Sequence, residues 1–276
     1  MDLVIIIVNY NTKGHLQACL HSLCDARTTC SHQIVVVDNG SSDSSVELFR
    51  TEWPDVRLIE LGENVGFGPA NNLGIQATRS DLVLFLNSDT VVPPGAVDRL
   101  VRHLRDAPDV TAVGPRLVDA DGYPELSFGP MITPWVEAWQ KLRGTLLRRR
   151  VPGLAAWVAR STTRPHDSDW VSGACLLVRR EDVETVGLFD ERFFLYAEDV
   201  DLCASLRQLG RRVLFAPDVE IVHHGGRSGV TDLDTTHTVY RRSQLAFYEK
   251  HHPAWVPLLR LYLKAKGVLP PGLVLL

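Results

Sequence analysis

The first half of the chain alternates short apolar runs with stretches whose apolar residues recur at helical spacing. Runs of strand length occur at residues 3–8, 34–37, 56–59 and 82–86. Helical spacing follows each run and predicts helices at residues 13–24, 44–50, 69–78 and 95–104. Near-continuous apolar strands that alternate with helices indicate a parallel sheet covered by helices on both faces.

The second half is less regular. Strand patterns occur at 110–118 and 171–178, and shorter ones at 212–215 and 219–222. A helix is predicted over 199–209, where Gly210 ends it. Residues 129–169 break the alternation of strands and helices. This half therefore predicts a smaller, irregular subregion attached to the sheet.

Composition and charge exclude several classes of protein. Of the 276 residues, 45% are hydrophobic and 22% are charged, which allows a large core and disfavours a disordered chain. The net charge of −4 excludes a globally basic nucleic-acid-binding protein. The longest apolar runs span about six residues, whereas a membrane-spanning helix needs roughly 20.

The start of the chain and its cysteines favour a cytoplasmic location. Met1 and Asp2 precede the first apolar run without a basic segment, so we expect no secretory signal. The five cysteines are odd in number and form no CxxC pair, which disfavours a disulfide framework or a zinc site. We interpret them as reduced, small core residues of a cytosolic protein.

Polar side chains follow three of the predicted strands at the point where each strand ends. The sequences are NYN at residues 9–11, DN at 38–39 and NSDT at 87–90. Because the carboxyl ends of parallel strands meet at one edge of a sheet, we expect the three clusters to converge there. Asn and Asp also favour simple turns, but three turns alone are a weaker explanation than one binding edge.

The glycine pattern disfavours two common nucleotide-binding classes. No GxGxxG sequence follows the first strand, and the glycine-rich stretch 62–68 follows the third strand with different spacing. That stretch also lacks the Lys-Ser/Thr pair of a P-loop. A dinucleotide-dependent oxidoreductase and a P-loop NTPase are therefore disfavoured.

Five motifs, taken in order, resemble the inverting family-two glycosyltransferases, most closely the rhamnosyltransferase-like branch. They are VIIIVNYN at 4–11, VVVDNGSSD at 35–43, NVGFGPANNLG at 64–74, LNSDT at 86–90 and FLYAEDVDL at 194–202. The resemblance spans about residues 3–230, and its specificity lies in the ordered set more than in any single motif.

The resemblance implies the GT-A fold, a Rossmann-like, mostly parallel sheet sandwiched by helices with a smaller acceptor-side subregion. It implies a nucleotide-sugar-binding part at residues 1–115 and an acceptor and catalytic part of the same domain at 116–230. A C-terminal helical extension is expected at 231–276. A nucleotide-diphospho-sugar donor and a divalent metal are implied as well.

The same resemblance assigns donor-binding residues. Asp38 matches the position that accepts a hydrogen bond from the imide of a uracil or thymine base, as a carboxylate can. Tyr10, with Asn9 and Asn11, matches the loop that packs on the base and ribose. The remaining expected donor contacts are Asn64, Gly66, Asn72 and Ser88.

A metal site is expected at Asp89 and His223. The sequence Asn87-Ser88-Asp89 stands where the family carries Asp-x-Asp, with Asn87 replacing the first Asp. A second ligand is therefore needed, and related transferases place a histidine about two dozen residues beyond the catalytic acid motif. That spacing indicates His223, with His224 as the other candidate. Carboxylate oxygen suits Mn²⁺ or Mg²⁺, and an imidazole ligand favours Mn²⁺.

The catalytic base is expected in the sequence Glu198-Asp199-Val200-Asp201. Acidic residues in a first helical turn can simply complement the helix dipole. The family motif instead assigns Asp199 as the base that deprotonates the acceptor hydroxyl during a single displacement. Glu198 and Asp201 are then expected to orient the acceptor or to cap the helix.

The function implied is a metal-dependent inverting glycosyltransferase in cell-envelope polysaccharide synthesis. The best guess for its donor is dTDP-L-rhamnose, and its acceptor is a saccharide or a polyprenyl-linked saccharide. Alternatives are a UDP-sugar-dependent transferase of the same fold and a catalytically inactive nucleotide-sugar-binding protein. A nucleotidyltransferase is disfavoured because no Gly-rich, basic signature follows the first strand.

Two segments suggest peripheral contact with the inner face of a membrane. Residues 141–164 hold seven basic residues and no acidic one, and Trp135 and Trp139 precede them. The C-terminal residues 255–276 combine apolar side chains with Arg260, Lys264 and Lys266. Basic and tryptophan side chains both favour an anionic membrane surface, although a solvated basic loop is the simpler interpretation of 135–164.

Overall fold

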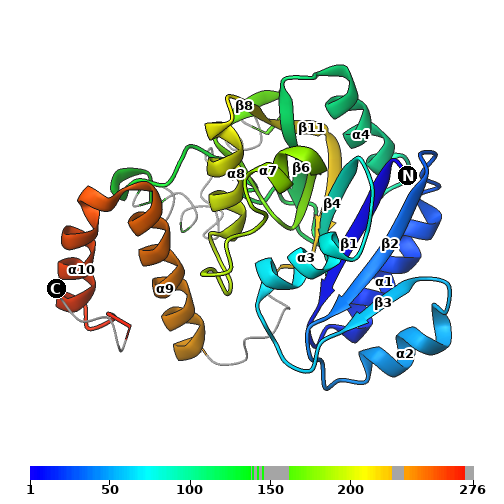
Figure 1. The fold of residues 1–276 in the computed structure, drawn as a ribbon, viewed down its shortest axis with the longest axis horizontal. Coiled ribbons are helices and arrows are strands. Elements are labelled where there is room, and N and C mark those ends of the chain that lie inside the picture. The colour runs from blue at the N-terminus through cyan, green and yellow to red at the C-terminus, as the bar shows by residue number, and fades with distance from the viewer. Residues whose placement is uncertain (138, 140–141, 143–144, 146–161, 226–232, 271–276) are drawn as a thin grey trace.

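The computed structural model describes residues 1–137, 139, 142, 145, 162–225 and 233–270. Within these residues, one central sheet lies between two layers of helices, and two further helices lie at one end of the molecule (Figure 1). The strands of this sheet, in spatial order, are β3 (Arg57–Glu60), β2 (His32–Asp38), β1 (Leu3–Asn9), β4 (Leu82–Asn87), β10 (Cys175–Arg179), β6 (Val110–Val118), β11 (Arg212–His223) and β5 (Thr90–Val91), and β8 (His166–Ser168) also pairs with β11.

The four strands of the first half run parallel, as their apolar pattern predicts. β1 pairs with β2 so that Asn9 lies opposite Asp38, and it pairs with β4 so that Val8 lies opposite Asn87. The carboxyl ends of these strands therefore lie at the same edge of the sheet.

The second half extends the same sheet. β10 runs antiparallel between β4 and β6, and β11 runs parallel to β6. β6 and β11 therefore point the same way as β1 and β4, so their carboxyl ends reach the same edge. The short strand β5 pairs antiparallel with the end of β11, which places His223 opposite Thr90.

Helices cover both faces of the sheet, which confirms the predicted fold class. Side chains of β1 alternate between the two faces, with Ile5 in one buried cluster and Ile6 in the other. Helices α1 (Lys13–Asp25), α2 (Ser45–Glu52) and α4 (Ala96–Asp106) cover the face of Ile5. Helices α3 (Phe67–Gln76), α7 (Arg180–Thr185) and α8 (Glu198–Gln208) cover the other.

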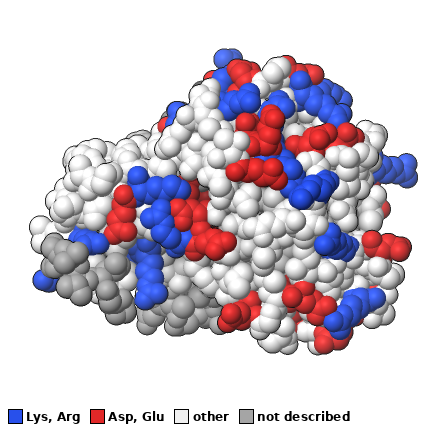
Figure 2. All heavy atoms as spheres, viewed as in Figure 1, with Lys and Arg blue, Asp and Glu red and all other residues white. Residues whose placement is uncertain are grey.

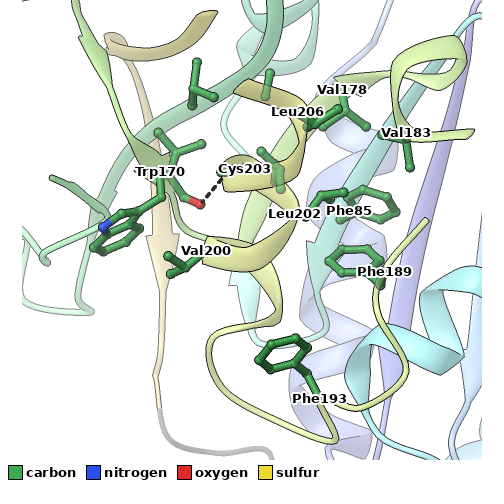
Figure 3. Close-up of a cluster of buried hydrophobic side chains, with 14 of the residues drawn as sticks. Phe85, Trp170, Val178, Val183, Phe189, Phe193, Val200, Leu202, Cys203 and Leu206 are labelled. Carbon is green, nitrogen blue, oxygen red and sulfur yellow. Dashed lines mark hydrogen bonds between the residues drawn. The ribbon is translucent and has the colours of Figure 1, made fainter. Parts of the chain in front are cut away.

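Helix α8 is fixed by the apolar cluster beneath it. Leu202 and Leu206 point from α8 towards the sheet, where Phe85 and Phe189 pack with their rings 4.8 Å apart (Figure 3). The thiol of Cys203 on the same helix also lies 3.9 Å from a backbone oxygen of β9 (Trp170–Val171). Because this helix begins at Glu198, its packing sets the position of the acidic residues in its first turn.

Two C-terminal helices complete the chain. Helix α9 (Leu233–His251) is followed by a 3-10 turn at Pro253–Trp255 and by α10 (Val256–Ala265). They lie beside one another at the end of the molecule away from β3 (Figure 1). Leu245 of α9 and Leu263 of α10 are buried in the same cluster as α8. No helix among the described residues is long and apolar enough to cross a membrane.

Two predicted strands differ from the structure. The run 171–178 is not one strand, because residues 172–174 form a turn between β9, which pairs with β7 (Phe128–Gly129), and β10. The runs 212–215 and 219–222 form one strand, β11, with an irregular register between Ala216 and Glu220. Pro217 lies in that irregularity, and a proline there resembles a strand end in the sequence.

The basic segment expected to touch a membrane falls mostly outside the described residues. Positions 138, 140–141, 143–144 and 146–161 are among those not described. On the face drawn in Figure 2, Lys and Arg side chains are interspersed with Asp and Glu over the described part. That view therefore shows mixed charge and no extended region of one sign.

Asn72 joins helix α3 to the segment that precedes α8. Its side chain is buried, donates to the carbonyl of Phe189 at 2.9 Å and accepts from the Phe189 N–H at 3.0 Å. The backbone N–H and C=O of one buried residue are thus both satisfied by a single side-chain amide. Both polar groups of the Asn72 side chain therefore bind the backbone of Phe189, whereas the sequence predicts that Asn72 contacts the sugar donor.

We expect Asn72→Ala to lower the free energy of unfolding by about 1–3 kcal/mol, because it leaves a buried N–H and C=O unpaired. Urea denaturation measures this change, and Gln76→Ala on the exposed face of α3 is the control. An unchanged unfolding midpoint together with weaker nucleotide binding would contradict the packing role and favour a donor contact.

Candidate active site

A cleft of about 290 Å³ opens at the sheet edge where the parallel strands end. Residues from distant parts of the chain line it together: Tyr10, Asn64, Asp89, Glu198, Asp199 and His223. Asp89 and Asp199 are 110 positions apart in the sequence, yet both border this one cleft. The fold thus brings the expected metal ligands and the expected base into one site.

Asp89, His223 and Glu125 form a chain of contacts on one side of the cleft. Asp89 is 1% exposed, and its Oδ1 lies 3.4 Å from Nε2 of His223. On the other side of the imidazole, Nδ1 donates to Oε2 of Glu125 at 2.8 Å. Asn87, the residue that replaces the first Asp of the motif, lies 3.3 Å from the same Nε2 through Nδ2. The carboxylate of Glu125 thereby fixes the orientation of the ring.

Burial and charge act against each other in this group. Burial lowers the pKa of His223, but the carboxylates of Asp89 and Glu125 outweigh it and raise that pKa to about 9. Burial raises the pKa of Asp89, but His223 outweighs it and holds that pKa below its usual range. With no other cation present, Asp89 and His223 therefore form an ion pair.

The same residues fit a divalent cation. Oδ1 of Asp89 is buried and makes no hydrogen bond, although Nε2 of His223 lies 3.4 Å away. This carboxylate oxygen can therefore accept a cation. A histidine whose Nδ1–H is held by a carboxylate, here Glu125, presents Nε2 as a ligand, the usual arrangement of metal-binding histidines. The described residues contain no group of three or more His, Cys, Asp and Glu arranged for a metal. A cation here would need further oxygen ligands from a bound molecule.

Asp199 lies in the first turn of α8 and is oriented by backbone donors. The N–H of Gly173 donates to its Oδ2 at 2.8 Å, and the N–H of Val200 donates to its Oδ1 at 2.8 Å. Burial raises the pKa of Asp199 even though these donors oppose the shift. The turn at 172–174 that splits the predicted strand is what brings the Gly173 N–H to this carboxylate.

Glu198 is more enclosed than Asp199. Its side chain is 7% exposed, and its Oε2 has no hydrogen-bond partner. Burial, and secondarily the charge of Asp199, raises its pKa. Two neighbouring carboxyl groups with raised pKa values accept protons more readily than free carboxylates do, which suits general-base chemistry near neutral pH.

Asp38 ends β2 beside the cleft and not in it. Its carboxylate accepts from Nδ2 of Asn9 at 2.8 Å and from the N–H of Ser41 at 2.9 Å. It borders a neighbouring hollow together with Gly40 and Ser41. Asn9 is fully buried and supports Asp38, while Asn11 accepts from the N–H of Ser42 at 2.7 Å. Both asparagines therefore shape the loops that end β1 and β2.

The loop 64–67 is held against the segment before α8. Asn39 donates to Oδ1 of Asn64 at 2.8 Å and to the carbonyl of Gly66 at 3.2 Å. Gly66 has a φ of +97°, and a Cβ there would lie 2.5 Å from the carbonyl oxygen of Phe194. Only glycine permits this approach, so the wall of the cleft depends on it.

Besides Asn9, Asn11 and Asp38, three further expected site residues do not line the cleft. Asn72 binds the backbone of Phe189, as described above. Ser88 is buried, and its hydroxyl contacts that of Thr12 at 2.7 Å. Asp201 accepts from Lys250 at 2.8 Å, and its other oxygen lies 2.7 Å from Nε2 of His251, so it joins α8 to α9. The expectation that Asp201 faces an acceptor is corrected, because these contacts occupy both of its oxygens on the far side of α8.

Sequence reasoning missed three residues of this site. Glu125 lies in the loop after β6, where no motif indicates it. Gly173 was counted within a strand. Asn39 was noted only as part of a strand-end cluster, although its side chain binds the loop 64–66. The position of Asn39 directly after Asp38 was the one available signal.

Comparisons with known proteins agree with this geometry. Residues 4–162 match glycosyl transferase family 2. The chain is 31% identical, over 92% of its length and 86% of the relative's, to an N-acetylglucosaminyl-diphospho-decaprenol L-rhamnosyltransferase of Mycobacterium tuberculosis.

Two solved structures share the fold. One is GalNAc-T7 with UDP, GalNAc and Mn²⁺, with a TM-score of 0.61 and 19% identity; the match covers 89% of this chain and 48% of that one. The other is a mannosyltransferase from Pyrobaculum calidifontis with GDP-Man and Mn²⁺, with a TM-score of 0.59 and 18% identity, covering 97% and 71%. They confirm the predicted GT-A fold. The family match and the 31% identical relative show that the chain belongs to glycosyl transferase family 2.

Proposed function

We propose that the protein is a metal-dependent inverting transferase that moves L-rhamnose from dTDP-rhamnose to a saccharide or polyprenyl-linked acceptor. The observation that carries the proposal is the placement of Asp89, His223 and Asp199 on one cleft. The similarity to a rhamnosyltransferase whose named acceptor is N-acetylglucosaminyl-diphospho-decaprenol supports the choice of sugar and acceptor class. Such an acceptor fits cell-envelope polysaccharide synthesis in the cytoplasm.

In the proposed reaction Asp199 is the general base. The acceptor oxygen forms a bond to the anomeric carbon while the bond from that carbon to the dTDP oxygen breaks. The hydroxyl proton moves to a carboxylate oxygen of Asp199, which the N–H groups of Gly173 and Val200 hold in place. A single displacement with base and leaving group on opposite sides inverts the anomeric carbon. General-base catalysis typically contributes about 10²–10⁴-fold in rate.

Asp89 and His223 would hold the divalent cation, with Mn²⁺ favoured over Mg²⁺ because one ligand is an imidazole. When bound, the cation stabilises the negative charge that builds on the diphosphate as it leaves. By accepting from Nδ1, Glu125 orients the ring so that Nε2 would be the ligand atom once a cation displaces its proton. The donor's own phosphate oxygens would complete the coordination that two protein ligands leave open.

Donor recognition would lie at the ends of β1 and β2. Asp38 can accept from the imide N–H of thymine, which uracil shares, so a UDP-sugar donor is the alternative within the same fold. Tyr10 and Asn64 line the same cleft as Asp89. A nucleotide-sugar-binding protein without activity is the other alternative, and turnover of dTDP-rhamnose by the wild-type protein would exclude it.

We further propose that α10 contacts the membrane that carries a lipid-linked acceptor. Leu258, Leu261 and Tyr262 are 55%, 61% and 49% exposed and fall on one side of the helix, with Lys264 in its last turn. Leu259 and Leu263 face the core instead. An apolar helix face beside basic side chains is typical of helices that lie at a lipid interface.

Asp199→Asn should lower kcat for rhamnose transfer by about 10²–10⁴-fold with donor affinity nearly unchanged, because the amide keeps the size but cannot take the proton. The assay uses dTDP-rhamnose with Mn²⁺ and an N-acetylglucosaminyl diphosphate acceptor on a short alkyl chain. Asp201→Asn on the same helix should lower stability, because it weakens the contacts to Lys250 and His251, but should keep most of its kcat, because its carboxylate does not line the cleft. An active Asp199→Asn beside an inactive Asp201→Asn would show that the base is misassigned.

Asp89→Asn should remove most of the gain in dTDP affinity that Mn²⁺ gives, by roughly 10-fold or more, because a charged ligand is lost. Calorimetry of dTDP binding with and without Mn²⁺ measures it. Thymidine should bind both proteins equally, since its contacts lie at Asp38 and Tyr10. Asp218→Asn, an exposed carboxylate on β11, is the matched control. An unchanged metal effect in Asp89→Asn would refute the ligand assignment.

The double variant Leu258→Ser and Leu261→Ser should sediment several-fold less with phosphatidylglycerol vesicles, because each leucine loses an apolar burial of roughly 1–3 kcal/mol. Turnover of the short-chain acceptor should not change. Leu73→Ser with Leu209→Ser, at similarly exposed leucines elsewhere, is the control. Equal sedimentation of both double variants would reject a membrane contact through α10.

A further inference from the structure

Tyr196 is an aromatic residue in the wall of the cleft. The proposed metal site, donor contacts and catalytic base give it no role. It lines the same cleft as Asp199, and 39% of its surface is exposed. It lies three positions before Asp199, in the segment that leads into α8. An aromatic side chain left partly bare beside a proposed base is available to a ligand.

The position of the base indicates which ligand part meets Tyr196. The attacking hydroxyl must lie within hydrogen-bond reach of Asp199, about 2.6–3.2 Å. In an inverting displacement the leaving diphosphate lies on the opposite side of the anomeric carbon, which is the side of Asp89. The sugar ring that carries the attacking hydroxyl therefore lies against the residues around Asp199. Phe67, Phe194 and Tyr196 are aromatic residues of that part of the cleft, and Tyr196 is the exposed one among them.

The backbone at Tyr196 is held in a costly conformation. Tyr196 and Ala197 have φ values of +70° and +66°, in the left-handed region that bulky residues rarely adopt. Such conformations persist where surrounding contacts determine them, and they cluster at ligand sites. Here the carbonyl of Leu195 accepts from the hydroxyl of Ser243 at 2.7 Å, and that of Phe194 accepts from the N–H of Phe67 at 2.9 Å.

Helix α9 supports the ring as well as the backbone. The ring of Tyr240 meets that of Tyr196 nearly edge-on, with centroids 5.9 Å apart and an interplanar angle of 69°. The hydroxyl of Tyr240 donates to Glu137 at 2.7 Å, and Gln244 donates to the same carboxylate at 2.6 Å. A buried, hydrogen-bonded layer of α9 thus stands behind the exposed face of Tyr196.

We propose that Tyr196 is the surface on which a sugar ring of the acceptor stacks, and that Tyr240 and Ser243 hold it there. The ligand class is a saccharide whose pyranose ring presents an apolar C–H face to the aromatic ring, while hydroxyl groups remain free for polar contacts. The proposal rests on the proposed function, because it takes Asp199 as the base that faces the acceptor.

The test compares wild type with Tyr196→Ala, Tyr196→Trp and Tyr123→Ala, where Tyr123 is a similarly exposed tyrosine outside the cleft. The probe is N-acetylglucosaminyl diphosphate on a short alkyl chain. Tyr196→Ala should raise the KM for this probe roughly 10-fold, whereas Tyr196→Trp should restore it to near the wild-type value. Hydrolysis of dTDP-rhamnose without acceptor, and the KM for the donor, should change less than about two-fold. Ser243→Ala should raise the probe KM in the same direction.

A wild-type probe KM in Tyr196→Ala would overturn the proposal, as would an equal loss of donor hydrolysis, which indicates a general structural role. If wild type does not turn over dTDP-rhamnose, the proposed function fails, and calorimetric binding of the probe decides about Tyr196 separately. Weaker binding to Tyr196→Ala than to wild type and Tyr123→Ala then supports the stacking surface. Equal or absent binding in all three refutes it.

Discussion

The active site depends on the pairing of a two-residue strand, β5, with the end of β11. This pairing places Thr90 opposite His223, and the N–H of His224 donates to the carbonyl of Asp89 at 2.9 Å. Asp89 lies in the turn between β4 and β5. β4 is not a neighbour of β11 in the sheet, so the pairing of β5 with β11 brings Asp89 within 3.4 Å of His223. Because the backbone pairing holds the two side chains close together, both proposed ligands would be positioned before a cation binds, and little reorganisation would be needed.

The opposite wall of the cleft depends on α8 and on what surrounds it. The apolar cluster around Leu202 and Phe189 fixes the helix to the sheet, and Asp201 ties it to Lys250 and His251 of α9. The N–H of Gly173 then orients Asp199 within that fixed helix. Residues beyond the matched family segment therefore form this wall of the cleft, because α8 and α9 both lie outside residues 4–162.

The parallel sheet, and the edge of it at which the cleft opens, could be predicted from the sequence. Apolar runs identify buried strands directly. Because parallel strands end at the same edge of a sheet, the polar residues after β1, β2 and β4 can be placed at that edge. The orientation of individual side chains could be predicted less well from the sequence. Asp201 is two positions after Asp199, and two residues turn an α-helix by about 200°, so the two carboxylates point to opposite sides. Helical geometry therefore separates Asp199 from Asp201 already in the sequence, whereas the family motif places both residues on the acceptor side.

Other features need the folded chain. Glu125 reaches His223 across 98 positions, and no local pattern marks a loop carboxylate as the partner of a distant imidazole. Residues 171–178 are apolar enough to resemble one strand. The turn at 172–174 separates β9, which belongs to the two-stranded sheet with β7, from β10, which belongs to the central sheet. Asn72 has the residue type of a ligand contact, but burial against Phe189 assigns it to packing.

The central claim is that Asp89 and His223 hold a divalent cation on the donor diphosphate, across the cleft from Asp199. A crystal structure with Mn²⁺ and dTDP, with the metal located by anomalous scattering, tests it most directly. The account predicts one manganese peak at about 2.0–2.3 Å from Oδ1 of Asp89 and Nε2 of His223, with phosphate oxygens in its remaining positions. A manganese ion bound elsewhere, or dTDP bound with Asp89 and His223 still paired to each other, would contradict it.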